Sequence, residues 1–142
     1  AIRAYHEWMP IRDLPNGIFR SFRIGRLVAL VMLDTRLHGR DARVGPEDHA
    51  GASDAGRSML GADQTTWLLE RLSESKRAGT RWRGVGQQVV FSPMRGAAGD
   101  FNPDSWDGYR ANRDQIDAQA LLEKEATPPC GGFKKLFRRC TP

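Results

Sequence analysis

The sequence has little cysteine, and the two cysteines do not lie where they could hold a domain together. Cys130 and Cys140 both fall in the C-terminal end of the 142-residue chain. They cannot cross-link the body of the chain, and no histidine accompanies them at the spacing of a zinc site. A small loop disulfide between them would require an oxidising compartment. The cysteines therefore exclude a disulfide-stapled body and leave the compartment undecided.

Long hydrophobic runs are also missing. The longest apolar run covers the seven residues 27–33, far short of the roughly 20 residues that cross a bilayer. The chain begins with Ala1 and continues Tyr-His-Glu-Trp from residue 5, without the basic and apolar regions of a signal peptide. We therefore expect no membrane span and a single domain. The N-terminal end looks truncated, so any targeting signal would be missing.

Acidic residues are absent after Glu125, and this absence accounts for most of the net charge of +5. The tail holds four of the 22 basic residues, which leaves 18 basic against 17 acidic side chains and a net of +1 for residues 1–125. We expect one domain over 1–125 and a tail, 126–142, outside the fold. The nearly neutral body argues against nucleic acid as a partner. The alternative function is a non-catalytic module whose basic tail, with Phe133, Leu136 and Phe137 interleaved, binds an anion or nucleic acid.

The apolar run 27–33 predicts a central strand covered on both faces. Asp34, Thr35 and Arg36 follow it directly. Ligands bind at the carboxyl ends of strands in open α/β sheets, so these side chains could meet a phosphate oxygen or a metal. The alternative is a capped strand end with an Asp34–Arg36 ion pair, which the spacing alone favours.

The rest of the pattern predicts an α/β fold around this strand. The expected elements are a strand at 20–24, a two-residue turn at Gly25-Arg26, a helix at 60–78, a strand at 82–91 and a second helix at 107–124. Together they make a strand hairpin, a βαβ unit and a covering helix. Gln87 and Gln88 lie inside the last strand. Either one of them points into the crevice beside Asp34 and Arg36, or both are exposed at an edge.

Two loops contain groups that could bind a metal. His38, Asp41, Asp48 and His49 lie in the glycine-rich segment 37–56, where solvated side chains are the stronger interpretation because no flanking element holds their geometry. The segment 100–107 alternates oxygen-bearing residues like a calcium loop. It has Ser105 where the EF-hand requires glycine and Ala111 where it requires glutamate. We expect turn-forming and helix-capping carboxylates there.

Five motifs together resemble the alkaline phosphatase D (PhoD-like) family of the metallophosphoesterase superfamily. They are Tyr5-His-Glu-Trp-Met-Pro-Ile-Arg12, Leu33-Asp-Thr-Arg36, Met59-Leu-Gly-Ala-Asp-Gln64 with Trp67-Leu68, Gln87-Gln-Val-Val-Phe-Ser92, and Asp104-Ser-Trp-Asp-Gly-Tyr109 with Asn112-Arg113. They run in order over about residues 1–116. The resemblance implies an internal fragment of a secreted, extracellular or periplasmic phosphomonoesterase and phosphodiesterase, and a partial α/β/β/α sandwich.

The resemblance also implies a cluster of iron and calcium at the strand ends, but the family's Asp- and His-rich metal-binding motifs have no counterpart in this sequence. Where the wider superfamily places a metal-binding histidine, the chain has Gln87 and Gln88. We therefore expect Arg36 and Asp34 as the catalytic side chains and Arg36 as the group that binds phosphate. Gln88 and Gln87 would contact the metal ligands without binding the metals themselves. We expect the chain alone to be inactive.

Overall fold

The computed structural model describes residues 2–9, 11–12, 17–93 and 101–125. The elements in chain order are α1 (Ile2–Trp8), β1 (Arg20–Ile24), β2 (Val28–Met32), the 3₁₀ turn η1 (Gly51–Ser53), α2 (Gly61–Arg77), β3 (Trp82–Gly86), the 3₁₀ turn η2 (Trp106–Tyr109) and α3 (Arg110–Glu125). The basic tail 126–142 and both cysteines lie outside the described residues. No helix in the described part of the chain has the length and apolar character needed to cross a membrane.

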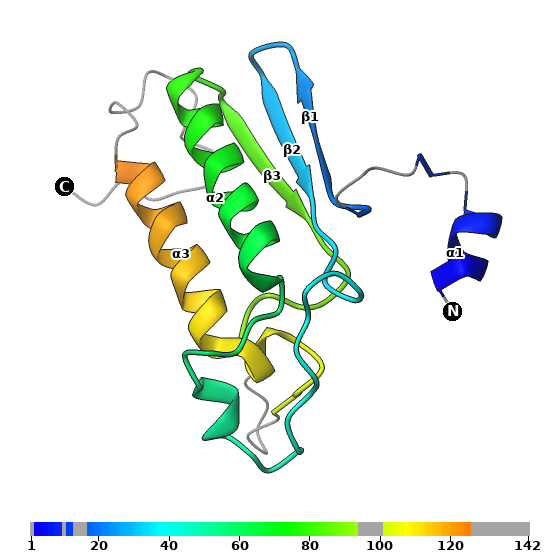
Figure 1. Cartoon of the computed structure of the whole chain (residues 1–142). Coiled ribbons are helices and arrows are strands. Elements are labelled where there is room, and N and C mark those ends of the chain that lie inside the picture. The colour runs from blue at the N-terminus through cyan, green and yellow to red at the C-terminus, as the bar shows by residue number, and fades with distance from the viewer. Residues whose placement is uncertain (1, 10, 13–16, 94–100, 126–142) are drawn as a thin grey trace.

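The sheet has the order β1-β2-β3 (Figure 1). β1 and β2 are antiparallel, with Arg20 opposite Met32 and Ile24 opposite Val28, whereas β2 and β3 are parallel. At the turn between β1 and β2 the amide of Leu27 donates to the carbonyl of Ile24 at 3.1 Å, and Gly25 has φ 54°. The predicted hairpin, βαβ unit and two helices are therefore confirmed, and the fold is a mixed α/β domain.

The prediction for β3 is wrong beyond Gly86. We expected a strand over 82–91, but the ladder ends where the amide of Leu33 donates to the carbonyl of Gly86 at 2.9 Å. The physical reason is that the next backbone groups of the β2 extension bind the side chain of Gln88 instead of a neighbouring backbone. Val89 and Phe91, which looked like strand residues, turn away and pack against the core.

The core lies between one face of the sheet and the pair α2 and α3, which run side by side in Figure 1. Its buried hydrophobic cluster comprises Val31, Leu33, Met59, Leu60, Leu68, Leu72, Trp106, Tyr109 and Ile116. α2 contributes Leu68 and Leu72 because residues four apart lie on one face of a helix. Trp67 is partly buried against this cluster and meets the ring of Phe19 edge to face, with ring centres 4.8 Å apart.

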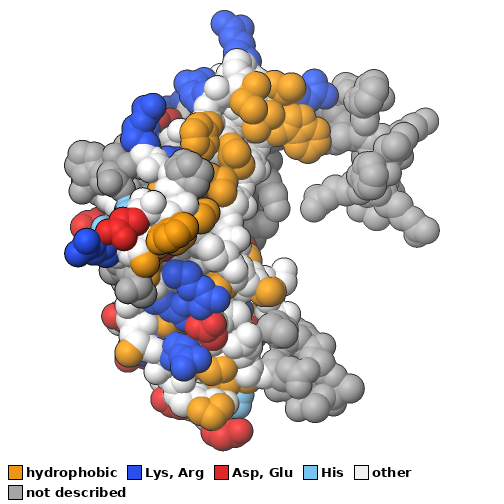
Figure 2. Space-filling model, turned by 90° about the vertical axis from the view of Figure 1, so that its right-hand side faces the viewer, with side chains coloured by type: hydrophobic (Ala, Val, Ile, Leu, Met, Phe, Trp, Pro, Cys, Tyr) orange, Lys and Arg blue, Asp and Glu red, His pale blue; other side chains and the backbone are white. Residues whose placement is uncertain are grey.

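The opposite face of the sheet is apolar and exposed. Alternate residues of β2 point away from the helices, and the cross-strand register aligns them with the outward residues of β1. The exposed large hydrophobic residues on this face and at the hairpin turn are Phe22, Ile24, Leu27, Met32 and Trp82; Ile24 and Trp82 are each 62% exposed. Figure 2, which views the molecule from the β1 side, shows hydrophobic side chains gathered in a band that descends from the top.

The 142-residue chain is therefore expected to associate and to bind a hydrophobic dye. Each 100 Å² of apolar surface left in water forfeits about 2.5 kcal/mol, and a continuous apolar sheet face promotes self-association. The paired substitution Phe22→Thr with Ile24→Thr should lower dye fluorescence and shift sedimentation toward monomer. Val90→Thr, at an exposed residue outside the strands, is the control. Monomeric wild-type sedimentation with a cooperative thermal transition above about 50 °C would contradict this expectation.

Candidate functional site

The chain segment that leaves β2 is fixed by two glutamine side chains. Gln64, fully buried on α2, accepts from the amide of Asp34 at 2.8 Å and donates to its carbonyl at 2.9 Å. Gln88 accepts from the amide of Thr35 at 2.9 Å and donates to the carbonyl of Leu33 at 2.9 Å. Each amide thus replaces a missing neighbouring strand, so the backbone of residues 33–35 remains fully hydrogen-bonded beyond the end of the sheet.

Asp34 shapes the loop that carries the next residues. It is 2% exposed, and its carboxylate accepts hydrogen bonds from the backbone amides of Arg36, Leu37 and His38 at 2.9, 3.0 and 3.1 Å. The anticipated ion pair between the side chains of Asp34 and Arg36 is replaced by these backbone contacts. Asp34 therefore fixes the backbone position of Arg36, and both carboxylate oxygens of Asp34 are hydrogen-bonded within the loop.

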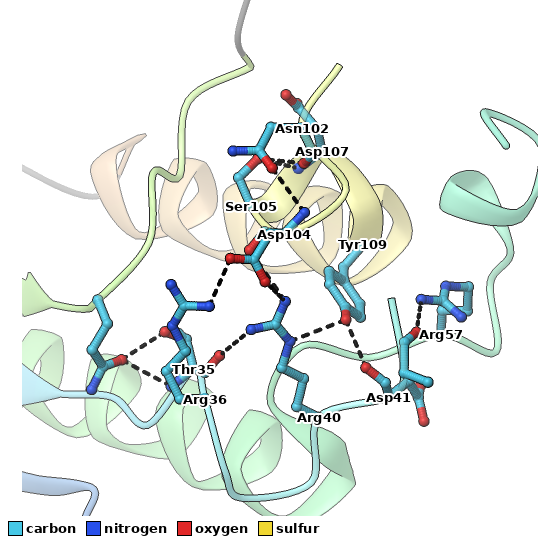
Figure 3. Close-up of polar contacts among 12 residues, drawn as sticks. Thr35, Arg36, Arg40, Asp41, Arg57, Asn102, Asp104, Ser105, Asp107 and Tyr109 are labelled. Carbon is cyan, nitrogen blue, oxygen red and sulfur yellow. Dashed lines mark hydrogen bonds and ion pairs between the residues drawn. The ribbon is translucent and has the colours of Figure 1, made fainter. Parts of the chain in front are cut away.

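Arg36 and Arg40 bind the two oxygens of one carboxylate. Arg36 Nη1 lies 2.8 Å from Asp104 Oδ2, and Arg40 Nη2 lies 2.8 Å from Asp104 Oδ1. Figure 3 shows Asp104 between the two guanidinium groups. The side chain of Arg40 is 9% exposed, whereas that of Arg36 is 46% exposed. The pair therefore combines a buried cation, which is structural, with a solvent-accessible cation at the carboxyl end of β2.

Tyr109 anchors the buried cation. Its hydroxyl accepts from Arg40 Nε at 3.1 Å and donates to the carbonyl of Asp41 at 2.6 Å (Figure 3). The guanidinium groups of Arg40 and Arg57 lie 5.3 and 5.1 Å from the centre of its ring, within the range of cation–π attraction. Arg40 also donates to the carbonyl of Thr35 at 3.1 Å. The loop after β2 is thereby tied to η2, nearly 70 residues further along the chain.

These contacts change the proton affinities of Asp104 and Arg40. The hydrogen bond from Arg36 lowers the pKa of Asp104 below its usual value, and Arg40 lowers it further, against the opposing effect of burial. Burial acts to lower the pKa of Arg40, but the hydrogen bonds with Tyr109 and Asp104 outweigh it, and the pKa is raised. The lowered pKa of Asp104 and the raised pKa of Arg40 keep both partners of this buried ion pair charged at neutral pH.

We expect the ion pairs of Asp104 with Arg36 and Arg40 to make the free energy of unfolding depend on pH in the acid range. Because the folded-state pKa of Asp104 is lowered, its stabilising contribution is present above its unfolded pKa, near pH 4, and is lost as pH falls through the folded value. Asp104→Asn should therefore unfold at lower urea concentration than wild type at pH 7, and the difference should shrink below about pH 4. Asp117→Asn, an exposed carboxylate of α3, is the control. A wild-type advantage that persists unchanged at pH 2–3 would contradict the assignment.

The two glutamines singled out from the sequence lie in different environments. Gln88 is the amide beside the β2 extension, where its Oε1 also accepts from the hydroxyl of Thr35 at 2.6 Å. Gln87 accepts from the indole N–H of Trp106 at 2.7 Å and thus holds the buried end of η2. Gln88 therefore binds Thr35, the residue between Asp34 and Arg36, whereas Gln87 is half-buried and binds the core residue Trp106.

In the candidate metal-binding loops, the carboxylates accept hydrogen bonds from backbone amides. Asp48 accepts from the amide of Gly51 at 2.8 Å, and Asp41 accepts from the amide of Ser58 at 2.7 Å. In the segment before α3 the helix cap is the hydroxyl of Ser105, which accepts from the amide of Asp107 at 3.2 Å. The expected capping carboxylates do other work, because the side chains of Asp104 and Asp107 form ion pairs with arginines. Within the described ranges, no three or more His, Cys, Asp or Glu side chains come together so that they could hold a metal ion.

Four site residues were not predicted from the sequence as members of this site: Gln64, Arg40, Asp104 and Tyr109. Gln64 does leave a signal, because it precedes Leu68 and Leu72 at four-residue spacing on the buried face of α2. A glutamine in such a stripe must find a partner in the core. The pairing of Arg40 with Asp104 leaves no signal, since 64 residues separate them and nothing in either segment identifies the other.

The comparisons with known proteins extend over most of the chain. The profile of the PhoD-like phosphatase family matches residues 1–127, beyond the point near residue 116 where the recognisable motifs stop. Alkaline phosphatase D of Bacillus subtilis (strain 168) is 34% identical over 129 aligned residues, covering 82% of this chain and 21% of that protein. A solved structure of PhoD is 31% identical with a TM-score of 0.72, covering 85% of this chain. The chain spans about a quarter of the length of that structure. It belongs to the PhoD-like phosphatase family.

Proposed function

We propose that this chain provides the phosphate-binding strand end of a metal-dependent phosphoesterase, with Arg36 contacting a phosphoryl oxygen of the substrate. One observation supports this most directly: the guanidinium of Arg36 is 46% exposed while its backbone and its charge partner are fixed. A guanidinium carries five N–H donors in a planar fork that matches phosphate geometry. Arg36 therefore retains donors for an anion that approaches from solvent.

The substrates we propose are phosphate esters, both monoesters and diesters, as implied by family membership. An extracellular or periplasmic location is proposed on the same ground. Within this chain, Asp34 and Gln88 fix the backbone of the loop that contains Arg36. Gln87 accepts a hydrogen bond from the indole of Trp106. The catalytic contribution we assign to Asp34 is indirect, because its carboxylate is buried and bound to three amides.

Iron and calcium are the metals we propose for the whole site, but the donors described here do not fit them. Asp34 is saturated by backbone amides and Asp104 by two guanidinium groups. A calcium ion requires six to eight oxygen ligands, and no cluster of acidic or histidine side chains among the described residues offers them. We therefore propose that the metal ligands come from other residues of the protein, and we assign this chain no step at the metal.

Replacing Arg36 tests the proposal. Arg36→Ala should weaken binding of inorganic phosphate about 10-fold or more, because a charge-assisted hydrogen bond contributes roughly 1.5–3 kcal/mol. Arg36→Lys should restore part of the affinity, since it keeps the charge and loses the fork. Phosphate binding can be followed by ³¹P relaxation on the protein expressed from its complete gene.

The matched control is Arg71→Ala. Arg71 forms a comparable ion pair with Glu74 at 2.7 Å on α2, away from the strand end. It should leave phosphate binding unchanged. If Arg36→Ala and Arg71→Ala lose the same phosphate affinity, the effect comes from general surface charge, and a specific site at Arg36 is refuted.

A further inference from the structure

We infer that Asp104 is a positioning residue for Arg36, holding its guanidinium in the orientation that receives a phosphate group. The inference rests on the proposed function of Arg36. It assigns a role to a carboxylate that does not itself touch the substrate.

Asp104 is the fixed end of this ion pair. The amide of Asp104 donates to Asn102 Oδ1 at 2.9 Å, and Arg40 Nη2 binds both its Oδ1 at 2.8 Å and its backbone carbonyl at 3.2 Å. Arg40 is in turn held by Tyr109 at 3.1 Å. The carboxylate therefore has its backbone and one oxygen immobilised, and its second oxygen points toward Arg36.

Arg36 is the mobile end that this carboxylate restrains. Among the contacts of the described residues, its guanidinium has a single ion pair, from Nη1 to Asp104 Oδ2 at 2.8 Å. A long exposed side chain otherwise samples many rotamers, and ordering it opposes binding of a ligand. With Asp104 in place, this ordering already exists in the free protein, so a phosphate meets a preorganised donor.

The same carboxylate has an opposing electrostatic effect, and the two effects can be separated. As a negative charge beside Arg36, Asp104 lowers the local attraction for anions, so an electrostatic role alone predicts tighter phosphate binding when the charge is removed. A positioning role predicts weaker binding when the carboxylate is displaced with its charge intact. Asp104→Glu makes that displacement by one methylene group, and Asp104→Asn removes the charge.

The experiment measures the dissociation constant of inorganic phosphate by ³¹P relaxation in the protein expressed from its complete gene. We expect Asp104→Glu to weaken binding about three- to tenfold, the range expected for ordering one long side chain. In the Arg36→Ala background the same substitution should have no effect, because a double-mutant cycle cancels roles that do not pass through Arg36. Asp117→Glu, on the exposed part of α3, should leave binding unchanged in both backgrounds.

Each other outcome rejects the inference in a distinguishable way. Unchanged binding in Asp104→Glu together with tighter binding in Asp104→Asn would reduce Asp104 to an electrostatic group. Equal losses from Asp104→Glu with and without Arg36 would reduce it to a structural group. No loss in Arg36→Ala would overturn the proposed phosphate role of Arg36, and with it the inference.

A second variant keeps the test decisive if Asp104→Glu does not fold. Asn102→Ala removes the acceptor that fixes the amide of Asp104, at an exposed residue where unfolding is not expected. It should weaken phosphate binding about two- to threefold in the presence of Arg36 and not in its absence. Unchanged binding in Asn102→Ala, with Arg36→Ala impaired, would reject the role assigned to Asp104.

Discussion

Trp106→Ala is expected to destabilise the domain by about 3–5 kcal/mol, a large part of the roughly 5–15 kcal/mol that holds a domain folded. Trp106 is completely buried in the core cluster, and its ring meets Phe91 edge to face at 5.1 Å. The substitution leaves a cavity between the sheet and the helices. It also leaves the Oε1 of the half-buried Gln87 without its indole donor, which adds the cost of a lost hydrogen bond.

Urea unfolding of Trp106→Ala and Trp82→Ala would measure this effect. Trp82 is 62% exposed on the sheet, so the same chemical change there should cost little or relieve association. Trp106→Phe should be intermediate, because it fills most of the cavity and still loses the hydrogen bond. Similar unfolding midpoints for the two alanine variants would contradict the assignment of Trp106 to the core.

The 142-residue chain by itself is expected to show no metal-dependent hydrolysis of an aryl phosphate above the buffer rate. Phosphoesterases of this kind use metals to neutralise charge and activate water, and the carboxylates of Asp34 and Asp104 are already engaged by protein donors. Since enzymes accelerate reactions by about 10⁶-fold or more, the loss should be complete on the scale of an assay.

The measurement follows aryl phosphate hydrolysis by the purified chain with iron and calcium added together and singly. The matched controls are Asp34→Ala and Asp117→Ala. Hydrolysis that copurifies with the chain, depends on metal and disappears only in Asp34→Ala would show that the described residues suffice for a metal site. That outcome would overturn the separation we propose between this segment and the metal ligands.

The elements of the fold were largely predictable because they depend on local periodicity. The apolar run 27–33 predicted β2, Gly25-Arg26 predicted the turn, and the helix predicted over 60–78 is α2, which is followed by Gly79 with φ 65°. The five family motifs were equally visible, and the family profile covers the same segments. These features are encoded by residues close together in the chain, so no knowledge of packing was needed.

The roles of the site residues were decided by contacts between distant segments. Asp34 and Arg36 are neighbours in sequence, yet one turns inward to bind three amides and the other turns outward to bind Asp104. The alternating apolar pattern predicts that β3 continues to residue 91, but the strand ends at Gly86. The side chain of Gln88 makes the hydrogen bonds to residues 33 and 35 that a longer strand would make.

The sequence by itself determined β1, β2, α2, α3, the start of β3 and the family of this protein, since each depends on spacing and residue type along a short stretch. Only the tertiary structure decided which cation is buried and which remains accessible. Arg36 and Arg40 have the same chemistry and lie four residues apart, but Tyr109 lies over one of them and not the other. Burial and ion pairing depend on what packs nearby in space, and Asp104 and Tyr109, which bind these two arginines, lie 64 or more positions further along the chain.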